Sequence, residues 1–121
     1  MSAGEFVGGL LHSVTVAHVF HLQQKGPGSY ARHVALEALY GGIQDAADEL
    51  AECYQGCYGL IDDYPSTFDL PSGEVGAWLD SLSEFVQRGR EGMPQDSEIQ
   101  NLIDEVQGLI DRAIYKVRNL E

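Results

Sequence analysis

Apolar residues recur at three- and four-residue steps in four stretches of the chain, which is the spacing of one face of an α-helix. The first helix is predicted to begin at Ser2, where Glu5 completes a capping-box pattern, and to end before the turn at residues 26–28. The second should run from about Ser29, a residue that favours the N-cap position, to about Gly59. No stretch shows the sustained alternation of a β-strand. The pattern therefore predicts an all-α protein.

The third and fourth helices follow a stretch from Leu60 to Ser72 that has two prolines and no helical periodicity. Ser72 is expected to cap the third helix, which should end before Gly92, and Asp96 is expected to cap the fourth. In the fourth helix a nearly unbroken heptad-like repeat of apolar residues continues almost to the end of the chain. We expect residues 1–121 to form a single domain, a four-helix bundle.

The lengths of the connections indicate how the helices are arranged. The first and last connections are tight, so helices one and two should be antiparallel, and so should helices three and four. The middle connection can span roughly 40 Å at ~3.3 Å per residue, close to the length of the second helix, about 45 Å at ~1.5 Å per residue. This predicts a ferritin-like four-helix bundle with one long crossover between helices two and three. A plain up-down-up-down bundle would not need so long a connection, although it could loop the extra residues out.

The charge balance narrows the classes of partner. Seven basic against nineteen acidic side chains give a formal net charge of -12, which argues against a nucleic-acid partner. No apolar run approaches the ~18 to 20 residues that cross a bilayer, and the N-terminus lacks the basic segment of a signal peptide. We expect a cytoplasmic protein that does not bind membranes. Cys53 and Cys57 are expected to be small, partly buried residues in a reduced compartment.

Four potential metal ligands share one face of the second helix. His33, Glu37, Asp48 and Glu52 fall within an arc of roughly 100°. Asp48 nevertheless lies more than about 20 Å from His33 along the axis, so no single ion can contact both. The pairs His33/Glu52 and Glu37/Asp48 have the same midpoint, between residues 42 and 43. The sequence therefore predicts two half-sites that one chain cannot complete.

A second copy of the chain could complete both half-sites. An antiparallel copy of the helix that crosses through a two-fold axis would place Glu52 opposite His33 and Asp48 opposite Glu37. Gly41 and Gly42 would lie at the crossing, where missing side chains permit close approach. His21, beside the first turn, should approach His33. Each site of the homodimer would contain His21, His33 and Glu37 of one chain with Asp48 and Glu52 of the other. Nitrogen and oxygen ligands without thiolate suit iron, manganese or zinc.

The segment from His21 to Glu52 resembles the metal-site motif of the Dps family, the ferritin-like miniferritins. All four intervals between the family's metal ligands are matched by His21, His33, Glu37, Asp48 and Glu52. The resemblance implies that these residues bind and oxidise Fe(II) with peroxide or oxygen at the interface of a two-fold dimer. It leaves open whether such dimers assemble into a twelve-subunit cage that stores iron. Leu22 and Gln23 depart from the family's usual Trp-Asn, and Glu37 stands where Asp is usual.

Two other functions remain open. One is a four-helix structural or interaction protein that kept the fold but lost redox turnover; the other is a dimeric sensor or carrier of zinc or manganese. Three further side chains are expected to have lesser roles: His18 as an auxiliary group beside His21, and Asp45 and Glu49 as flanking acids that attract iron or are simply solvated. His12 is interpreted as an ordinary helix-face residue.

Overall fold

The computed structural model describes residues 1–121 and contains four α-helices and no β-strand. The helices are α1 (Ala3–Gln23), α2 (Ser29–Tyr58), α3 (Val75–Gly92) and α4 (Ser97–Asn119). The prediction of an all-α protein with four helices is therefore confirmed. No helix combines the length and the hydropathy that crossing a bilayer requires.

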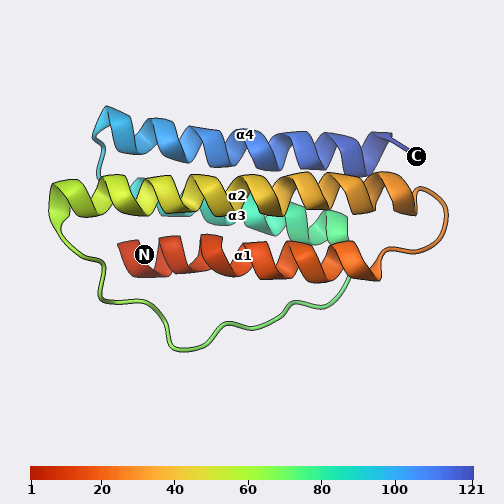
Figure 1. The fold of residues 1–121 in the computed structure, drawn as a ribbon, viewed down its shortest axis with the longest axis horizontal. Helices are drawn as coiled ribbons and strands as arrows, with labels where there is room; N and C mark the ends of the chain where they lie inside the picture. Colours follow the sequence, from red (N-terminus) through yellow and green to blue (C-terminus); the bar gives the residue numbers. More distant parts are fainter.

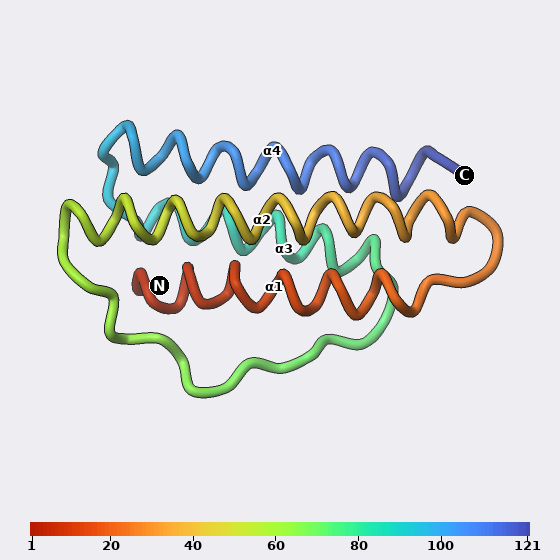
Figure 2. The backbone as a smooth tube through the Cα atoms, in the orientation of Figure 1, coloured from red at the N-terminus to blue at the C-terminus, as the bar shows by residue number.

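The four helices form a bundle in which each helix packs against two neighbours (Figure 1). Helix α1 contacts α2 and α3, and α4 contacts the same two helices, so α1 lies diagonally across from α4 and α2 from α3. Helices that pack against each other run in opposite directions (Figure 1). Residues 59–74, called the strap below, pass along the outside of the bundle from the end of α2 to the opposite end, where α3 begins (Figure 2).

The predicted start of α1 is confirmed in detail. The hydroxyl of Ser2 accepts a hydrogen bond from the Glu5 N–H at 3.1 Å, and a Glu5 carboxylate oxygen accepts one from the Ser2 N–H at 3.2 Å. These two bonds satisfy amide groups that have no partner within the helix. The capping box therefore defines where the chain enters the bundle.

The predicted caps of α2 and α3 are wrong, and in both cases a glycine with positive φ lies within two residues of the first helical residue. Gly28 is the N-cap of α2, with φ of 76°, and Ser29 is the first helical residue. Gly73 has φ of 103°, a conformation that side chains other than hydrogen disfavour, so the turn extends past Ser72. Glu74 then occupies the N-cap position of α3, without a side-chain capping bond.

The core is one continuous cluster with members from all four helices. Its largest fully buried side chains include Phe6, Leu10, Leu36, Leu39, Ile43, Leu50, Leu79, Ile99, Ile103 and Ile110. Two reciprocal contacts join α1 to α3: the ring of Phe6 lies over Gly89, and the ring of Phe85 lies over Gly9. The two rings stack with centroids 5.6 Å apart. A Cβ atom at either glycine would overlap the opposing ring, so glycine at these positions sets the separation of the two helices.

The strap is attached to α1 by specific contacts. The carboxylate of Asp63 accepts a hydrogen bond from the Gly4 N–H at 3.0 Å. Nε2 of His12 donates to the carbonyl oxygen of Asp69 at 2.7 Å, and the His12 ring stacks on Phe68 at 4.9 Å. His12 thus holds the strap on α1 and is occupied by that contact.

Asp96 is the N-cap residue of α4, as predicted, but its carboxylate does not cap the helix. It accepts a hydrogen bond of 2.5 Å from the hydroxyl of Tyr58, the last residue of α2. This bond links the end of α2 to the start of α4. The hydrogen bond to Asp96 and, to a smaller extent, shielding from water raise the pKa of Tyr58 to about 12.

Replacing Asp96 with Asn is expected to lower the pKa of Tyr58 towards the usual value of about 10. Because the folded pKa is raised, the contribution of this bond to stability is present below pH ~10 and is lost as the pH rises to about 12. Absorbance titration of the phenolate measures the shift, and Tyr58→Phe assigns the signal to Tyr58. An unchanged titration midpoint in Asp96→Asn would show that the carboxylate does not control it.

Candidate metal centre

The end of α1 and the first turns of α2 bring His21 and His33 into direct contact. Nδ1 of His21 lies 2.6 Å from the carbonyl oxygen of His33, and Nδ1 of His33 lies 2.8 Å from the carbonyl oxygen of His21. The two rings stack with centroids 3.6 Å apart and planes 17° apart. The expectation that the tight turn places these two imidazoles together is therefore confirmed.

These reciprocal bonds determine which nitrogen of each ring is free. A carbonyl oxygen can only accept, so Nδ1 carries a proton in both rings, and in the neutral form of each ring the lone pair is on Nε2. His21 is only 7% exposed, and no fully buried polar side-chain atom lacks a hydrogen-bond partner. Because Nε2 of His21 has no such partner, it must reach solvent. The two Nε2 atoms are thus the ring nitrogens that remain available to a ligand.

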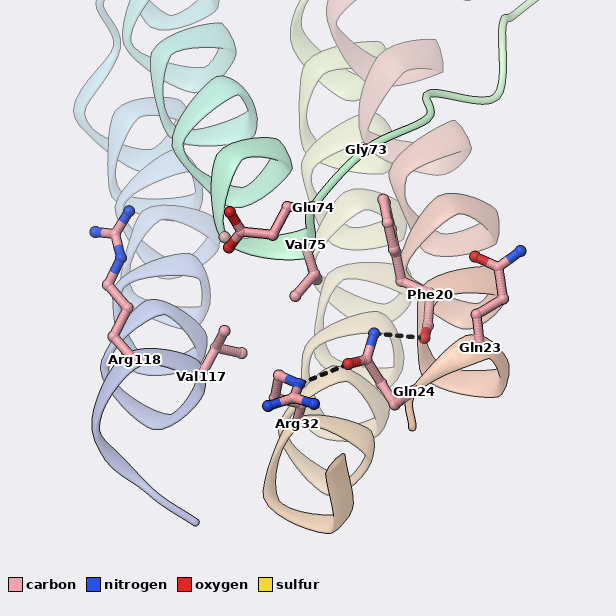
Figure 3. Close-up of a pocket in the computed structure, with 10 residues that line it drawn as sticks. Phe20, Gln23, Gln24, Arg32, Gly73, Glu74, Val75, Val117 and Arg118 are labelled. Carbon is pink, nitrogen blue, oxygen red and sulfur yellow. Dashed lines mark hydrogen bonds between the residues drawn. The ribbon is translucent and has the colours of Figure 1, made fainter. Parts of the chain in front are cut away.

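The turn that positions the histidines is held by Arg32, a residue that the sequence analysis missed. Nε of Arg32 donates to the side-chain carbonyl of Gln24 at 2.6 Å, and its two terminal nitrogens donate to the carbonyl oxygens of Pro27 and Lys25. Gln24 in turn donates to the carbonyl oxygen of Phe20 at 2.9 Å (Figure 3). An arginine in the first turn of a helix opposes the helix dipole. From the sequence, that unfavourable position could have indicated that Arg32 has a role other than stabilising its own helix.

A cavity of about 450 Å³ lies at this end of the bundle, between the turn network and the start of α3. Figure 3 shows Arg32 and Gln24 on one side of it and Glu74, Val117 and Arg118 on the other. Neither His21 nor His33 lines this cavity. Arg118 forms an ion pair with Asp80, and the nitrogens of Arg32 bond to the turn, so the cavity has no uncommitted cation.

Two more rings join the histidine pair. The exposed ring of His18 stacks on Tyr40 with centroids 4.3 Å apart and lies 5.7 Å from the ring of His21. Tyr40 also packs edge-on against His21 at 5.5 Å. Leu22, which stands where the Dps family usually has Trp, is 70% exposed. The phenol ring that packs against His21 is that of Tyr40. Its position seven residues after His33, two helical turns, could have revealed it.

Two of the three acids of the predicted site lie far from the histidine pair of the same chain. Glu37, Asp48 and Glu52 are all exposed on α2, and Asp48 is about 22 Å from His33 along the helix axis at ~1.5 Å per residue. Within one chain, no group of three or more His, Cys, Asp or Glu side chains is placed to hold a metal ion. The structure thus brings together the two imidazoles of the predicted set, and the two acids in the second half of α2 lie far from them.

The flanking acids lie beside the predicted site, on the edge of its face that is nearer to α4. Asp45 and Glu49 line a groove of about 480 Å³ between α2 and α4, opposite Asp104, Glu105 and Arg112.

The two central glycines of α2 also face different neighbours. At Gly42 a Cβ atom would overlap the side chain of Leu109 on α4, whereas at Gly41 nothing lies within 4 Å. The expectation that both glycines serve a crossing between two copies is wrong for Gly42, whose missing side chain accommodates α4. Gly41 alone faces outward.

Comparison with known proteins changes one conclusion from the sequence. Residues 21–117 match a family of unknown function, DUF5856. Over 115 residues, covering 93% of this chain and 85% of the relative, the chain is 27% identical to an uncharacterized 14.6 kDa protein in the mobD-ri intergenic region of Enterobacteria phage T4. No solved structure matches.

The resemblance to the Dps family is therefore wrong. The family that matches across most of the chain is a different one, and none of these matches is to a Dps or ferritin-like family. The resemblance rested on five positions whose intervals are those of one helix face on either side of a tight turn. Such intervals are compatible with helix geometry in other helical hairpins that expose polar residues on one side. The chain belongs to DUF5856, a family of unknown function.

Proposed function

We propose that this protein binds Fe(II) as a homodimer, at two equivalent sites that are each shared between subunits. In each site His21, His33 and Glu37 come from one subunit, and Asp48 and Glu52 come from the other. The observation that carries the proposal is the reciprocal bonding of His21 and His33, in which each Nδ1 bonds to the other residue's backbone carbonyl. An imidazole held through one nitrogen by a carbonyl, with the other nitrogen free, has the arrangement of a metal-ligating histidine.

The stacked rings favour two neighbouring ions rather than one shared ion. The lone pair of each Nε2 lies in the plane of its own ring, and the two planes are only 17° apart with centroids 3.6 Å apart. Lone pairs in nearly parallel, separate planes do not converge on one point at a bond length of about 2 Å. Each imidazole would therefore bind its own ion, and the exposed carboxylates would complete both.

The carboxylates support a shared site through their symmetry. Glu37 and Asp48 are equally distant from the middle of α2, as are His33 and Glu52, so an antiparallel α2 of a second copy would place Glu37 against Asp48. Two carboxylates that face each other repel unless a cation lies between them. Gly41, which is open on its outward side, would allow the two helices to approach. Ion binding and dimer formation are thus one proposal.

The proposed reaction is oxidation of Fe(II), the substrate, to Fe(III) by peroxide or oxygen. Each ion gives up one electron, so two adjacent ions supply the two electrons that, with two protons, reduce one peroxide to two waters. Carboxylate oxygens are hard ligands and favour Fe(III) over Fe(II). Zinc or manganese would suit the same nitrogen and oxygen donors, but a site filled with either metal would not produce Fe(III).

We also propose that the bundle has the ferritin-like arrangement with one crossover. Its support is that the strap ends at the opposite end of the bundle from where α2 ends, so α2 and α3 run in the same direction on a diagonal (Figures 1 and 2). In such bundles metal ligands project inward from facing helices. Here α2 contributes one imidazole and three acids, and they lie on its outward face, which is why the proposal needs a second copy.

A complementation experiment tests the shared site. His33→Ala and Asp48→Ala each remove a ligand from both sites of a homodimer, so each variant alone should lose saturable Fe(II) binding under anaerobic conditions. In a mixed dimer, one site carries both substitutions and the other carries neither. Random pairing of equal amounts makes half of the dimers mixed, each with one intact site of two, so at least about one quarter of the wild-type capacity should return. If the metal selects the mixed dimers, the recovery rises towards about one half.

The outcomes separate the proposals. Absence of recovery on mixing would overturn a site shared between subunits, and binding that survives in either single variant would overturn the ligand assignment. Addition of peroxide to the loaded protein tests the reaction through the absorbance of Fe(III). Tight binding without that absorbance increase would leave a metal carrier and no ferroxidase. Sedimentation of the same samples distinguishes a dimer from a larger shell of dimers.

A second candidate, an interaction protein without redox turnover, is favoured by one observation. Leu11 and Leu22 on α1 and Val34 on α2 are large apolar side chains that are 44%, 70% and 42% exposed. Leu11 and Leu22 are eleven residues apart, close to three helical turns, so they lie on one face of α1. Stable dimerisation that is independent of any metal would favour this candidate.

A further inference from the structure

A pair of thiols lies near the end of α2, away from the histidine pair. Cys53 and Cys57 are four residues apart, which places their Cβ atoms about 5–6 Å from each other on one side of the helix. Cys53 is half-buried and packs against the core, whereas Cys57 is exposed, and neither forms a disulfide. The two thiols are within hydrogen-bonding reach of each other.

Negative charge surrounds the outer thiol. The carboxylates of Glu98 and Asp96, in the first turn of α4 and at its N-cap, are close enough to act on Cys57. Shielding from water by its neighbours, and then the Cys53 thiol and these two acids, raise the pKa of Cys57. These negative charges favour the protonated thiol. A metal ion must therefore displace the thiol protons in order to bind, and that displacement is the costly step.

The number and type of ligands select the ion. Zinc in structural sites takes four ligands, and no three His, Cys, Asp or Glu side chains are placed together here. A soft monovalent ion differs, because two thiolates alone satisfy its preferred linear coordination, and thiolate is the ligand type that selects Cu(I). Side chains four apart on a helix can rotate towards a common point between them.

We propose that Cys53 and Cys57 form a two-thiolate binding site for Cu(I), independent of the proposed Fe(II) site. Binding replaces two S–H bonds with two S–Cu bonds and releases two protons, with no change in oxidation state. The inner thiol is fixed by packing against the core, and the exposed outer thiol gives the ion access. Because protons are released, affinity should rise with pH until both thiols are ionised.

Anaerobic titration of the reduced full chain with Cu(I), in competition with a chromophoric Cu(I) chelator, tests the proposal. The expected result is one Cu(I) per chain, with an ultraviolet absorption from sulfur-to-copper charge transfer. Cys53→Ser and Cys57→Ser should each weaken binding by at least about 100-fold, because one thiolate cannot give two-coordination. Glu98→Gln, which removes a neighbouring charge but no ligand, should not weaken binding, because exchange of two protons for one Cu(I) leaves the site one unit more negative.

Circular dichroism on the same samples controls for folding, and Cys57→Ser keeps the test decisive because Cys57 is exposed. Binding that is unchanged in either serine variant would overturn the paired site. One Cu(I) per two chains that persists in Cys53→Ser would also overturn it, since the ion would then bridge the Cys57 thiols of two copies. Failure of the Fe(II) experiments has no bearing on this result.

Discussion

Removal of the bound metal with a chelator is expected to separate the dimer into monomers. In the proposed antiparallel dimer, Glu37 of one subunit faces Asp48 of the other, and this happens twice. Two like charges at about 4 Å repel by roughly 1–4 kcal/mol, depending on exposure to water. Two such pairs give at least about 2 kcal/mol, which corresponds to a dissociation constant about 30-fold higher or more. Sedimentation velocity with and without chelator measures the change.

Matched variants identify the carboxylates as the cause. Glu37→Gln with Asp48→Asn removes the repulsion and the ligands together while keeping side-chain size, so this variant should dimerise to the same extent with or without chelator. Asp45→Asn with Glu49→Gln makes the same change in charge on the same helix, but in the groove beside α4. That control should retain the metal dependence. A wild-type dimer that is equally tight with and without chelator would refute the opposed carboxylates.

Phe6→Ala is expected to lower the free energy of unfolding by about 3–5 kcal/mol, a large part of the roughly 5–15 kcal/mol of a typical domain. Phe6 is 0% exposed, and its ring fills the space over Gly89 and stacks on Phe85. Its removal leaves a cavity between α1 and α3. Urea denaturation measures the loss as a lower midpoint with an unchanged slope. Phe68→Ala, at a strap residue that is 42% exposed, is the control and should lose much less.

A double substitution separates packing from a general loss of stability. Gly89→Ala alone should destabilise the protein, because the new Cβ atom would overlap the ring of Phe6. With Phe6→Ala present, that Cβ atom enters the vacated space, so the double variant should be more stable than the sum of the two single effects predicts. Strict additivity would show that Phe6 and Gly89 do not constrain each other.

The fold was more predictable from sequence than the details of its helix ends. Apolar periodicity identifies four helices because burial of one face is what stabilises a helix in a protein. The capping box at Ser2 was recognisable because both partners are local in sequence. The caps at Ser29 and Ser72 were misassigned because a glycine in the left-handed conformation, Gly28 or Gly73, determines where the turn stops.

The candidate site was predictable where it depends on helix geometry alone. A tight turn between antiparallel helices necessarily brings His21 towards His33, and the structure has them stacked. The reciprocal carbonyl bonds and the role of Arg32 depend on side-chain rotamers and on the path of the turn, which periodicity does not describe. Gly42 was misread because a missing side chain suits any close neighbour, and here the neighbour is α4 of the same chain. In the same way, equal intervals between the histidines and acids describe one helix face, and they do not show that two proteins belong to one family.

The strap gives the molecule the character of two helical hairpins joined by a tether. The hairpin of α1 and α2 and the hairpin of α3 and α4 each form from neighbours in sequence, so their assembly is local and fast, whereas their docking depends on residues 59–74. A tether of this kind keeps its two ends at an effective concentration in the millimolar range. Asp63, Phe68 and Asp69 fasten it along α1. A single cut in the strap would therefore convert an intramolecular docking step into association between two fragments. The affinity would then depend on the α1–α3 and α2–α4 contacts, and on any strap contacts to α1 that stay with the α3–α4 fragment.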